Sequence, residues 1–307
     1  MTVPIYIPTL NAEQSIEELL NALVNQLEAF EIILIDSSSK DKTVEIAKKF
    51  DVKVIQISRN EFNHATTRNL ALQKEADFYL FMTQDALPYD EYLVENLLEP
   101  FEDEDVVVSY ARQIPYEDAD IIERFARETN YPKESVVKSK ESLATIGIKT
   151  FFSSNSCAMY RASYFKKMGG FKEGLIMNED MEFAARAILD GKKIAYAAKA
   201  KVWHSHRYTF AQIFRRYFDI GVFFKTNGWI EDEIKRYHSS ESTGLKQVKK
   251  EMKYLWENAP FAIPQSFVTA GVKFLAYKLG KNYNKLPKQL VERMSLHKRW
   301  WEQRKTR

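Results

Sequence analysis

The sequence predicts an α/β fold with a mainly parallel sheet and flanking helices, followed by a C-terminal helical extension. Short apolar runs alternate with amphipathic stretches over the first 110 residues, and from about Phe210 onward the pattern is helical and rich in aromatic residues and lysine. Strand–helix alternation at this spacing is typical of a parallel sheet covered on both faces. We therefore expect a sheet domain over residues 1–210 and a basic helical region over residues 211–307.

The apolar runs give the expected strands, and the amphipathic stretches give the helices. In chain order the strands are Val3–Ile7, Glu31–Asp36, Lys53–Ile57, Phe78–Thr83 and Val106–Tyr110. The helices between them are Ser15–Gln26, Asp41–Phe50, His64–Lys74 and Glu91–Leu98. Residues 115–150 are polar and weakly periodic, which indicates helix and loop over a site. Phe152–Tyr160 and Val202–His206 return to strand character, and Glu179–Asp190 is helical with Asn178 as a candidate N-cap.

The composition is that of an ordinary globular protein, with 307 residues of which 45% are hydrophobic and 28% charged. A single cysteine, Cys157, excludes an intrachain disulfide and favours a reducing compartment. We expect neither a signal peptide nor a membrane-spanning helix, because no basic and apolar leader and no run of about 18 apolar residues is present.

The net charge of +3 conceals an asymmetry. Residues 241–307 hold fifteen Lys and Arg against five Glu and no Asp, a balance of +10, which leaves −7 for residues 1–240. A basic end on an acidic body indicates that the end meets an anionic partner.

The glycines exclude two large classes of nucleotide-binding protein. The first glycine of the chain is Gly147, so the α/β half contains neither of the glycine-rich loops that cradle phosphates in Rossmann dehydrogenases and P-loop nucleotidases. If this sheet binds a nucleotide diphosphate, side chains or a metal ion must neutralise its charge.

Polar residues follow four of the expected strands. They are the segments Pro8–Asn11, Asp36–Ser39, Asn63–His64 ahead of the Arg68 helix, and Thr83–Asp85. Ligands of open parallel sheets bind beyond the carboxyl ends of the strands. We therefore expect these segments to line one ligand crevice.

Five blocks carry a resemblance to a known family: IPTLNAEQSIEELLNAL, EIILIDSSSKDKT, HATTRNLAL, TQDALP and MNEDMEFAAR. In this order they resemble a family 2 glycosyltransferase with the GT-A fold, over roughly residues 1–210. FNHATTRNLA together with TQDALP resembles, more narrowly, the bacterial rhamnosyltransferases that use dTDP-L-rhamnose to build cell-wall or O-antigen polysaccharide. The resemblance implies an inverting transferase that moves L-rhamnose onto a lipid-linked saccharide, as a peripheral protein at the cytoplasmic face of the cell membrane.

The resemblance also implies which residues bind the donor. Asp36 would hydrogen-bond the nucleobase, with Pro8, Thr9 and Asn11 lining the same pocket, and Arg68, Asn69, Gln84 and Asp85 would complete the donor site. The planar, always charged fork of Arg68 suits a diphosphate or base contact. The alternatives are structural: Asp36 would cap the next helix, and Arg68 would be solvated on its own helix.

A metal site and a catalytic base are implied in the same way. The family's Asp-x-Asp motif has Thr83 at its first position here, so Asp85 alone would hold Mg²⁺ or Mn²⁺ with substrate phosphates and water. His204, two residues before His206, is a candidate to complete the metal site. The alternatives are that Asp85 only starts a turn and that the histidines form a packed or solvent-facing pair.

Asp180 would be the catalytic base that takes the acceptor hydroxyl's proton, and Glu179 would position the acceptor. The alternative is that both acids merely stabilise the first turn of their helix.

The C-terminal region mixes aromatic residues with cations, as in Phe214–Phe218 and Lys298–Trp301. Such belts suit a membrane interface, where Trp300 and Trp301 would insert. A helical subdomain with a solvated basic face and a homodimer are the alternatives, and no nucleic-acid partner is expected because no RNA-binding motif is present.

Three rival functions stay open. A UDP-hexose-dependent glycosyltransferase would have the same fold, and a non-catalytic nucleotide-sugar or glycan-binding protein would explain the altered Asp-x-Asp motif. A nucleotidyltransferase would need a glycine-rich N-terminal loop, which this sequence lacks.

Overall fold

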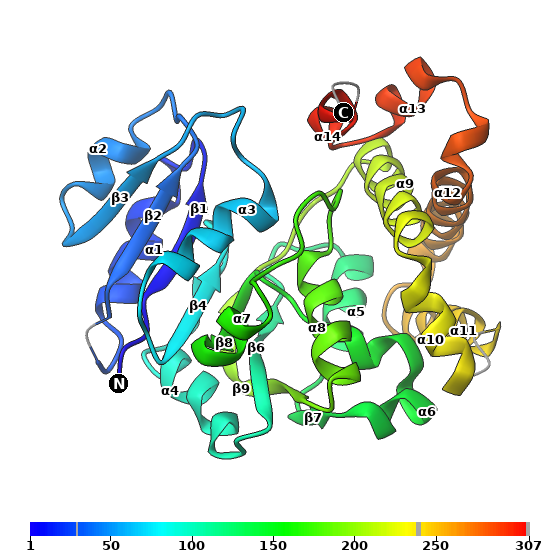
Figure 1. The fold of residues 1–307 in the computed structure, drawn as a ribbon. Coiled ribbons are helices and arrows are strands. Elements are labelled where there is room, and N and C mark those ends of the chain that lie inside the picture. Colours follow the sequence, from blue (N-terminus) through cyan, green and yellow to red (C-terminus); the bar gives the residue numbers. More distant parts are fainter. Residues whose placement is uncertain (29, 238–240, 305–307) are drawn as a thin grey trace.

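The N-terminal half of the sheet is parallel, as expected. The computed structural model describes residues 1–28, 30–237 and 241–304, with side chains in the last range described from residue 248. Strand β1 (Ile5–Thr9) lies between β2 (Ile32–Asp36) and β4 (Phe78–Met82), and β3 (Val52–Gln56) pairs with β2; all three pairings are parallel. The carboxyl ends of these strands therefore point the same way, and the four strands expected from the sequence here are confirmed (Figure 1).

The other half of the sheet is mixed, which the sequence did not predict. Strand β8 (Cys157–Arg161) lies antiparallel between β4 and β6 (Val106–Ile114), and β9 (Lys193–Trp203) runs parallel to β6. The short strands β5 (Leu87–Pro88) and β7 (Val136–Lys138) pair antiparallel with β9. The long segment between β6 and β8 does not cross back to the starting end of β6, so β8 enters the sheet in the opposite direction.

Helices flank both faces of this sheet. They are α1 (Ile16–Val24), α2 (Thr43–Ala47), α3 (His64–Arg68), α4 (Leu93–Leu98), α5 (Ile121–Asn130), α6 (Leu143–Ile146), α7 (Ala162–Lys167) and α8 (Glu179–Leu189). Side chains of β1 contribute to the hydrophobic clusters on both faces, since Ile5 and Ile7 belong to one cluster and Tyr6 to the other. Successive residues of a strand point to opposite faces of the sheet, which explains this distribution.

The helix expected over residues 64–74 is present but divided. Helix α3 ends at Arg68, and a 3₁₀ turn continues from Asn69 to Gln73. The Asn69 side chain turns inward, where its amide donates to Phe171 O at 2.9 Å and accepts from Phe171 N at 2.8 Å. This two-way amide contact fixes the loop before α8 against α3.

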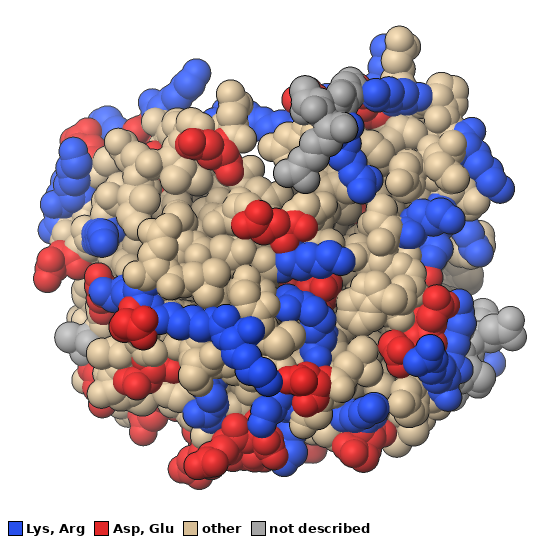
Figure 2. Space-filling view, in the orientation of Figure 1, with Lys and Arg blue, Asp and Glu red and all other residues tan. Residues whose placement is uncertain are grey.

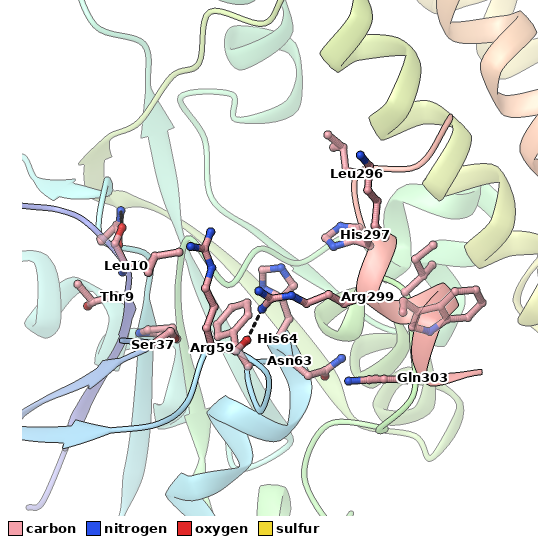
Figure 3. Close-up of a pocket in the computed structure, with 16 residues that line it drawn as sticks. Thr9, Leu10, Ser37, Arg59, Asn63, His64, Leu296, His297, Arg299 and Gln303 are labelled. Atoms are coloured by element: carbon pink, nitrogen blue, oxygen red, sulfur yellow. Dashed lines mark hydrogen bonds between the residues drawn. The ribbon is translucent and has the colours of Figure 1, made fainter. Parts of the chain in front are cut away.

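The C-terminal region is helical, as expected. It contains α9 (Phe210–Thr226), α10 (Gly228–Tyr237), α11 (Glu241–Asn258), α12 (Ile263–Lys281), α13 (Lys288–Met294) and α14 (Lys298–Gln303). The buried side chains Phe218 and Phe223 of α9 belong to the same hydrophobic cluster as Tyr6 and Phe81 of the sheet. The helices are thereby tied to the sheet, and α14 returns to lie near the ends of β1 and β2 (Figures 1 and 3).

One expectation about the C-terminal region needs revision. Trp300 and Trp301 are only 7% and 8% exposed, because they pack into the main hydrophobic cluster, so they are not free to insert into a membrane. The charges of the surface are mixed over most of the face shown in Figure 2, with Lys and Arg along the edge where Figure 1 places α12 and α13. Among the described residues, none of the helices has the length and apolar character needed to cross a membrane.

Candidate active site

A pocket of about 410 Å³ opens where β1, β2 and β4 end (Figure 3). Its volume is in the range of small-molecule sites. Pro8, Thr9 and Gln84, three of the residues predicted for the donor, line it. The other lining residues are Leu10, Ser37, Arg59, Phe62, Asn63, His64, Ile176, Leu296, His297, Lys298, Arg299, Trp300 and Gln303. The polar ends of separate strands therefore meet in one crevice, as their positions in the sequence predict.

Gln84 fixes the rim of this pocket. Its side-chain carbonyl accepts from Leu10 N at 2.7 Å, and its amide nitrogen donates to Leu10 O at 3.2 Å. The loop after β1 is thereby held against the loop after β4. The Thr9 hydroxyl donates to Ile7 O at 2.9 Å.

Asp36 and Asn11 are not among the lining residues, but each is next in the sequence to one that is, and they shape the loop after β2. Asp36 is fully buried, and one of its oxygens accepts from Ser39 N at 3.1 Å. Its other oxygen, Oδ1, has no hydrogen-bond partner among the described residues. Asn11, with a φ of 49°, accepts from Lys40 N at 2.9 Å. A buried carboxylate oxygen without a donor is costly, so Asp36 Oδ1 is a place where a ligand N–H would be stabilised.

Arg68 does not reach the pocket. It is 3% exposed, and its guanidinium donates to His64 O at 3.1 Å and to Glu179 Oε1 at 3.1 Å. Burial alone would raise the pKa of Glu179, but the Arg68 charge holds it below its usual range, so Glu179 is ionised. The pKa of His64 is lowered by burial, so this histidine is neutral. Arg68 thus serves to anchor the start of α8.

Asp180 is the carboxylate with the properties of a base. Asn155 N donates to Asp180 Oδ2 at 3.1 Å, and Met181 N donates to Asp180 Oδ1 at 2.8 Å. Burial and the neighbouring Glu179 charge raise the pKa of Asp180 to about 6, against the opposing effect of these two N–H groups. Such a group is ionised at neutral pH and still basic enough to accept a proton.

Asn155, which the sequence reasoning missed, holds both acids together. Besides its backbone contact to Asp180, its side-chain amide donates to Glu179 Oε1 at 3.2 Å and accepts from the Tyr160 hydroxyl at 2.7 Å. Asn178 precedes the helix in a left-handed conformation with φ 60° and makes no side-chain cap. The acids at the start of α8 are therefore fixed by a neighbouring loop, not by a capping side chain.

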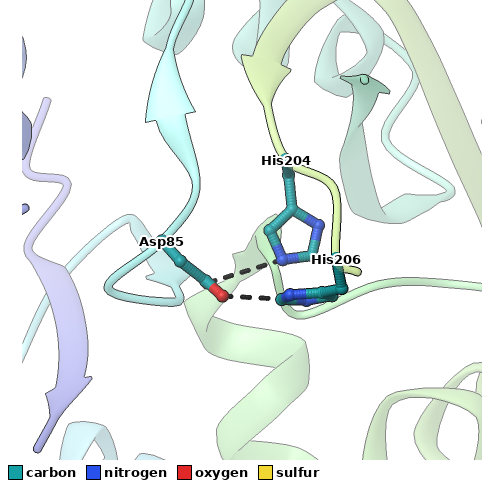
Figure 4. A group of neighbouring side chains, drawn as sticks. All are labelled: Asp85, His204 and His206. Carbon is teal, nitrogen blue, oxygen red and sulfur yellow. Dashed lines mark ion pairs between the residues drawn. The ribbon is translucent and has the colours of Figure 1, made fainter. Parts of the chain in front are cut away.

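Asp85, His204 and His206 come together beyond the ends of β4 and β9 (Figure 4). Their candidate ligand atoms all lie within 4.8 Å of one another. His204 Nε2 is 3.4 Å and His206 Nε2 is 3.7 Å from the Asp85 carboxylate. The predicted pairing of Asp85 with His204 is thus found as a contact, and His206 joins it.

The protonation of this cluster suits a divalent cation. Burial would raise the pKa of Asp85, but the neighbouring imidazoles and the Thr83 hydroxyl hold it well below its usual range. Burial, followed by the His204 charge, lowers the pKa of His206 to about 4, so this imidazole is neutral. His204 Nδ1 lies 2.8 Å from Gln113 Oε1, an acceptor, which assigns the proton to Nδ1 and leaves Nε2 toward Asp85. A carboxylate with two imidazole nitrogens beside it forms a donor set that fits Mn²⁺.

The C-terminal arm, Ser295–Gln303, closes one side of the pocket. Fully buried Asp219 on α9 accepts from Leu296 N at 2.8 Å, and the Trp300 indole donates to Gly174 O at 2.8 Å. Arg299 donates to Arg59 O, which ties the arm to the loop after β3 (Figure 3). Arg59, Lys298 and Arg299 bring three cations to a pocket that has no glycine loop.

Comparison with known proteins agrees with this architecture. The family model described as glycosyl transferase family 2 matches residues 5–169. The O-antigen chain rhamnosyltransferase WbaN of Salmonella anatum is 43% identical over 273 residues, which cover 88% of this chain and 86% of that protein. The O-antigen chain rhamnosyltransferase RfbN of Salmonella typhimurium is 41% identical over 305 residues, which cover 98% and 96%.

A solved structure shares the fold. The mannosyltransferase PcManGT from Pyrobaculum calidifontis, in complex with GDP-Man and Mn²⁺, superposes with a TM-score of 0.65 at 16% identity, covering 92% of this chain and 88% of its own. The expected GT-A-like α/β fold with C-terminal helices is confirmed.

Proposed function

The chain belongs to glycosyl transferase family 2, and on that premise we propose that it transfers L-rhamnose from dTDP-L-rhamnose to a lipid-linked saccharide in bacterial polysaccharide synthesis. The observation that carries the proposal is the half-buried base Asp180 at the start of α8, together with a pocket whose walls come from the same strand ends that the family motifs occupy. The two relatives named as O-antigen chain rhamnosyltransferases, which match most of the chain, support the choice of sugar.

The nucleotide of the donor would occupy the pocket between β1, β2 and the C-terminal arm. The N3–H group of thymine would satisfy Asp36 Oδ1, the buried oxygen that has no donor among the described residues. Arg59, Lys298 and Arg299 would neutralise the negative charge of the diphosphate. These side chains would take the place of the glycine-rich loop that the α/β half lacks. Charge-assisted hydrogen bonds of this kind are about twice as strong as neutral ones.

The transfer itself needs one base and one stabilised leaving group. The acceptor hydroxyl oxygen attacks C1 of the sugar while Asp180 takes its proton, and the bond from C1 to the diphosphate oxygen breaks. The electron pair leaves with dTDP, and the configuration at C1 inverts. The backbone N–H groups of Asn155 and Met181 orient one oxygen each of Asp180. The ionised Glu179 would hold the acceptor.

Asp85, His204 and His206 would hold the divalent ion. A bound Mn²⁺ or Mg²⁺ supplies positive charge to the leaving diphosphate. Two imidazoles in the donor set favour Mn²⁺ over Mg²⁺, since Mg²⁺ binds almost only oxygen.

The test is a transfer assay with dTDP-L-rhamnose, UDP-glucose, UDP-galactose and UDP-GlcNAc, each with a lipid-linked saccharide acceptor. We expect acceptor-dependent release of dTDP from dTDP-L-rhamnose. Faster turnover of a UDP-hexose would replace the donor while leaving the family assignment intact. Absence of nucleotide release from every donor would favour a binding protein without catalysis.

A further inference from the structure

Helix α12 turns small or hydroxyl side chains inward and large apolar side chains outward. Its buried positions are Ser266, Thr269, Ala276 and Gly280. Phe267, Val268, Phe274 and Leu275 are between 54% and 65% exposed. At about 3.6 residues per turn, these four fall on one side of the helix together with exposed Pro264 and Gly271. We call these six residues the α12 face.

The inward side of α12 is small for a packing reason. A Cβ on Gly280 would lie 2.0 Å from Phe218 O, and a Cβ on Gly221 would lie 2.3 Å from Tyr277 O. The backbones of α9 and α12 therefore meet almost directly, which leaves no room for large side chains between them. The packing of α12 on α9 gives no reason for the outer side to be apolar. An exposed contiguous apolar strip of this kind marks an interaction surface.

The cation beside the α12 face is Lys278, and the helix itself contains no Asp or Glu. Lys281 pairs with Glu231 of α10, and Lys273 lies over the Tyr217 ring of α9. Lys278 Nζ sits 5.6 Å from the Phe274 ring, so the cation borders the apolar strip. Figure 2 shows Lys and Arg along the edge of the molecule that Figure 1 assigns to α12 and α13.

Two further exposed aromatic side chains precede α12 in the sequence. Phe261 is 85% exposed and Trp256, near the end of α11, is 74% exposed. Apolar side chains bordered by lysine are the pattern of helices that lie in a membrane interface.

We propose that the α12 face docks on an anionic lipid bilayer, with its apolar side chains among the acyl chains and Lys278 at the headgroups. The proposal rests on the proposed function only in so far as a lipid-linked acceptor would lie in the same bilayer. A second copy of this chain fits less well, because a symmetric contact would bring the Lys278 side chains of two α12 helices together.

The test is co-sedimentation of the full chain, without donor or acceptor, with vesicles of phosphatidylglycerol and phosphatidylcholine or of phosphatidylcholine alone. We expect binding to the anionic vesicles that weakens with salt. The double variant Phe267→Ser, Phe274→Ser should lower the bound-to-free ratio at least about tenfold, since burying one such side chain is worth about 1.5–3 kcal/mol and about 1.4 kcal/mol is tenfold. The Trp256 emission should shift to shorter wavelength on binding, and the shift should be absent in Trp256→Phe.

Val136→Ser, Val137→Ser is the matched control, because it removes two exposed apolar side chains from β7, 44% and 52% exposed, away from α12. It should bind like the wild type. The proposal is overturned if the wild type stays in the supernatant with both vesicles, or if the α12 double variant binds undiminished. A double variant that turns a dimer into a monomer with vesicle binding unchanged would assign the face to a second copy. Donor hydrolysis, measured separately, reports on the catalytic proposal alone.

Discussion

Asp180 combines two requirements of a base that usually conflict, since it is half-buried beside a second acid and yet ionised at neutral pH. Two backbone N–H groups stabilise its charge, while burial and Glu179 oppose it, and the balance places its pKa at about 6. Asp180→Asn keeps the shape but cannot take a proton. We expect turnover to fall by about 10²–10⁴-fold with donor affinity nearly unchanged.

The measurement is steady-state kinetics beside a donor-binding titration. Asp190→Asn, the same change at the other end of α8, is the control and should keep activity. Retention of more than about a tenth of wild-type turnover in Asp180→Asn would show that another group is the base.

The raised pKa of Asp180 also predicts how activity and stability depend on pH. The base works only when ionised, so kcat/KM should fall as pH decreases through about 6. The folded protein binds this proton more tightly than the unfolded chain, whose pKa is near 3.8, so this group lowers the free energy of unfolding as pH rises from about 4 to about 6. Above about pH 6 the ionised Asp180 lowers the free energy of unfolding of the wild type by its full amount.

Asp180→Asn removes this destabilising effect. The inactive variant should therefore melt at a higher temperature than the wild type near neutral pH, and the difference should shrink toward pH 4. Thermal melts at a series of pH values test this. A variant that melts lower than the wild type at every pH would mean that the carboxylate stabilises the fold.

The cluster of Asp85, His204 and His206 gives a prediction about Mn²⁺ affinity, which can be measured without an activity assay. Asp85→Ala should abolish Mn²⁺ binding, because it removes the one carboxylate of the three-residue cluster. Gln113→Leu should weaken Mn²⁺ affinity about 10–100-fold, since Gln113 is not a ligand but orients His204. Calorimetry with Mn²⁺, alone and with dTDP, measures both.

Asp90→Ala, which removes a surface carboxylate paired with Lys201, is the control for the metal prediction. Full transfer activity in excess EDTA would contradict a metal requirement and leave Arg59, Lys298 and Arg299 as the groups that stabilise the leaving diphosphate.

At the scale of elements, the sequence predicted strands β1 to β4 well because each is a short apolar run bounded by polar residues. It did not predict that β8 runs antiparallel, since strand direction depends on how a long connection folds back and not on the strand's own residues. It also placed Arg68 at the ligand, whereas the structure pairs this residue with Glu179, 111 positions away. No local pattern reveals such a partner.

The C-terminal arm was the largest omission for the same reason. Leu296–Trp300 lie more than 280 residues from Thr9 in the sequence and still share its pocket. The only signal was the mixture of cations and aromatic residues at Lys298–Trp301, which favours a membrane as readily as a ligand. Burial of both tryptophans decides between these uses.

The arm predicts that a residue near the end of the chain controls donor affinity. Arg299→Ala should weaken donor binding by about 10-fold or more, because a hydrogen bond to a charged group contributes about 1.5–3 kcal/mol. Arg293→Ala, an exposed arginine on α13, is the matched control. Equal donor affinity in the Arg299 and Arg293 variants would place the diphosphate elsewhere.

For the whole molecule, the structure divides the basic end into two parts with different roles. Lys298 and Arg299 line the pocket, whereas Lys278 borders the α12 face. Deleting residues 241–307 would therefore damage the donor pocket and the proposed membrane face together. Only substitutions at single sites can separate the two.

The last prediction concerns the donor and involves the entire fold. Relatives named as rhamnosyltransferases match 88% and 98% of this chain, which is far more than the segments that carry the family motifs. Thymine differs from uracil by one methyl group, and Phe62, Ile176 and Leu296 give the pocket an apolar lining that can bury it.

We therefore expect dTDP-L-rhamnose, with Mn²⁺, to raise the melting temperature more than UDP-glucose, UDP-galactose or UDP-GlcNAc at equal concentration. A ligand at 100 times its dissociation constant stabilises the folded state by about 2.7 kcal/mol, which is a shift of several degrees for a protein of this size. Free dTDP and free UDP, run beside the sugars, separate base recognition from sugar recognition. The rhamnose assignment fails if UDP and dTDP raise the melting temperature equally and dTDP-L-rhamnose raises it no more than dTDP does. In that case the protein recognises neither the thymine base nor the sugar when the donor binds alone.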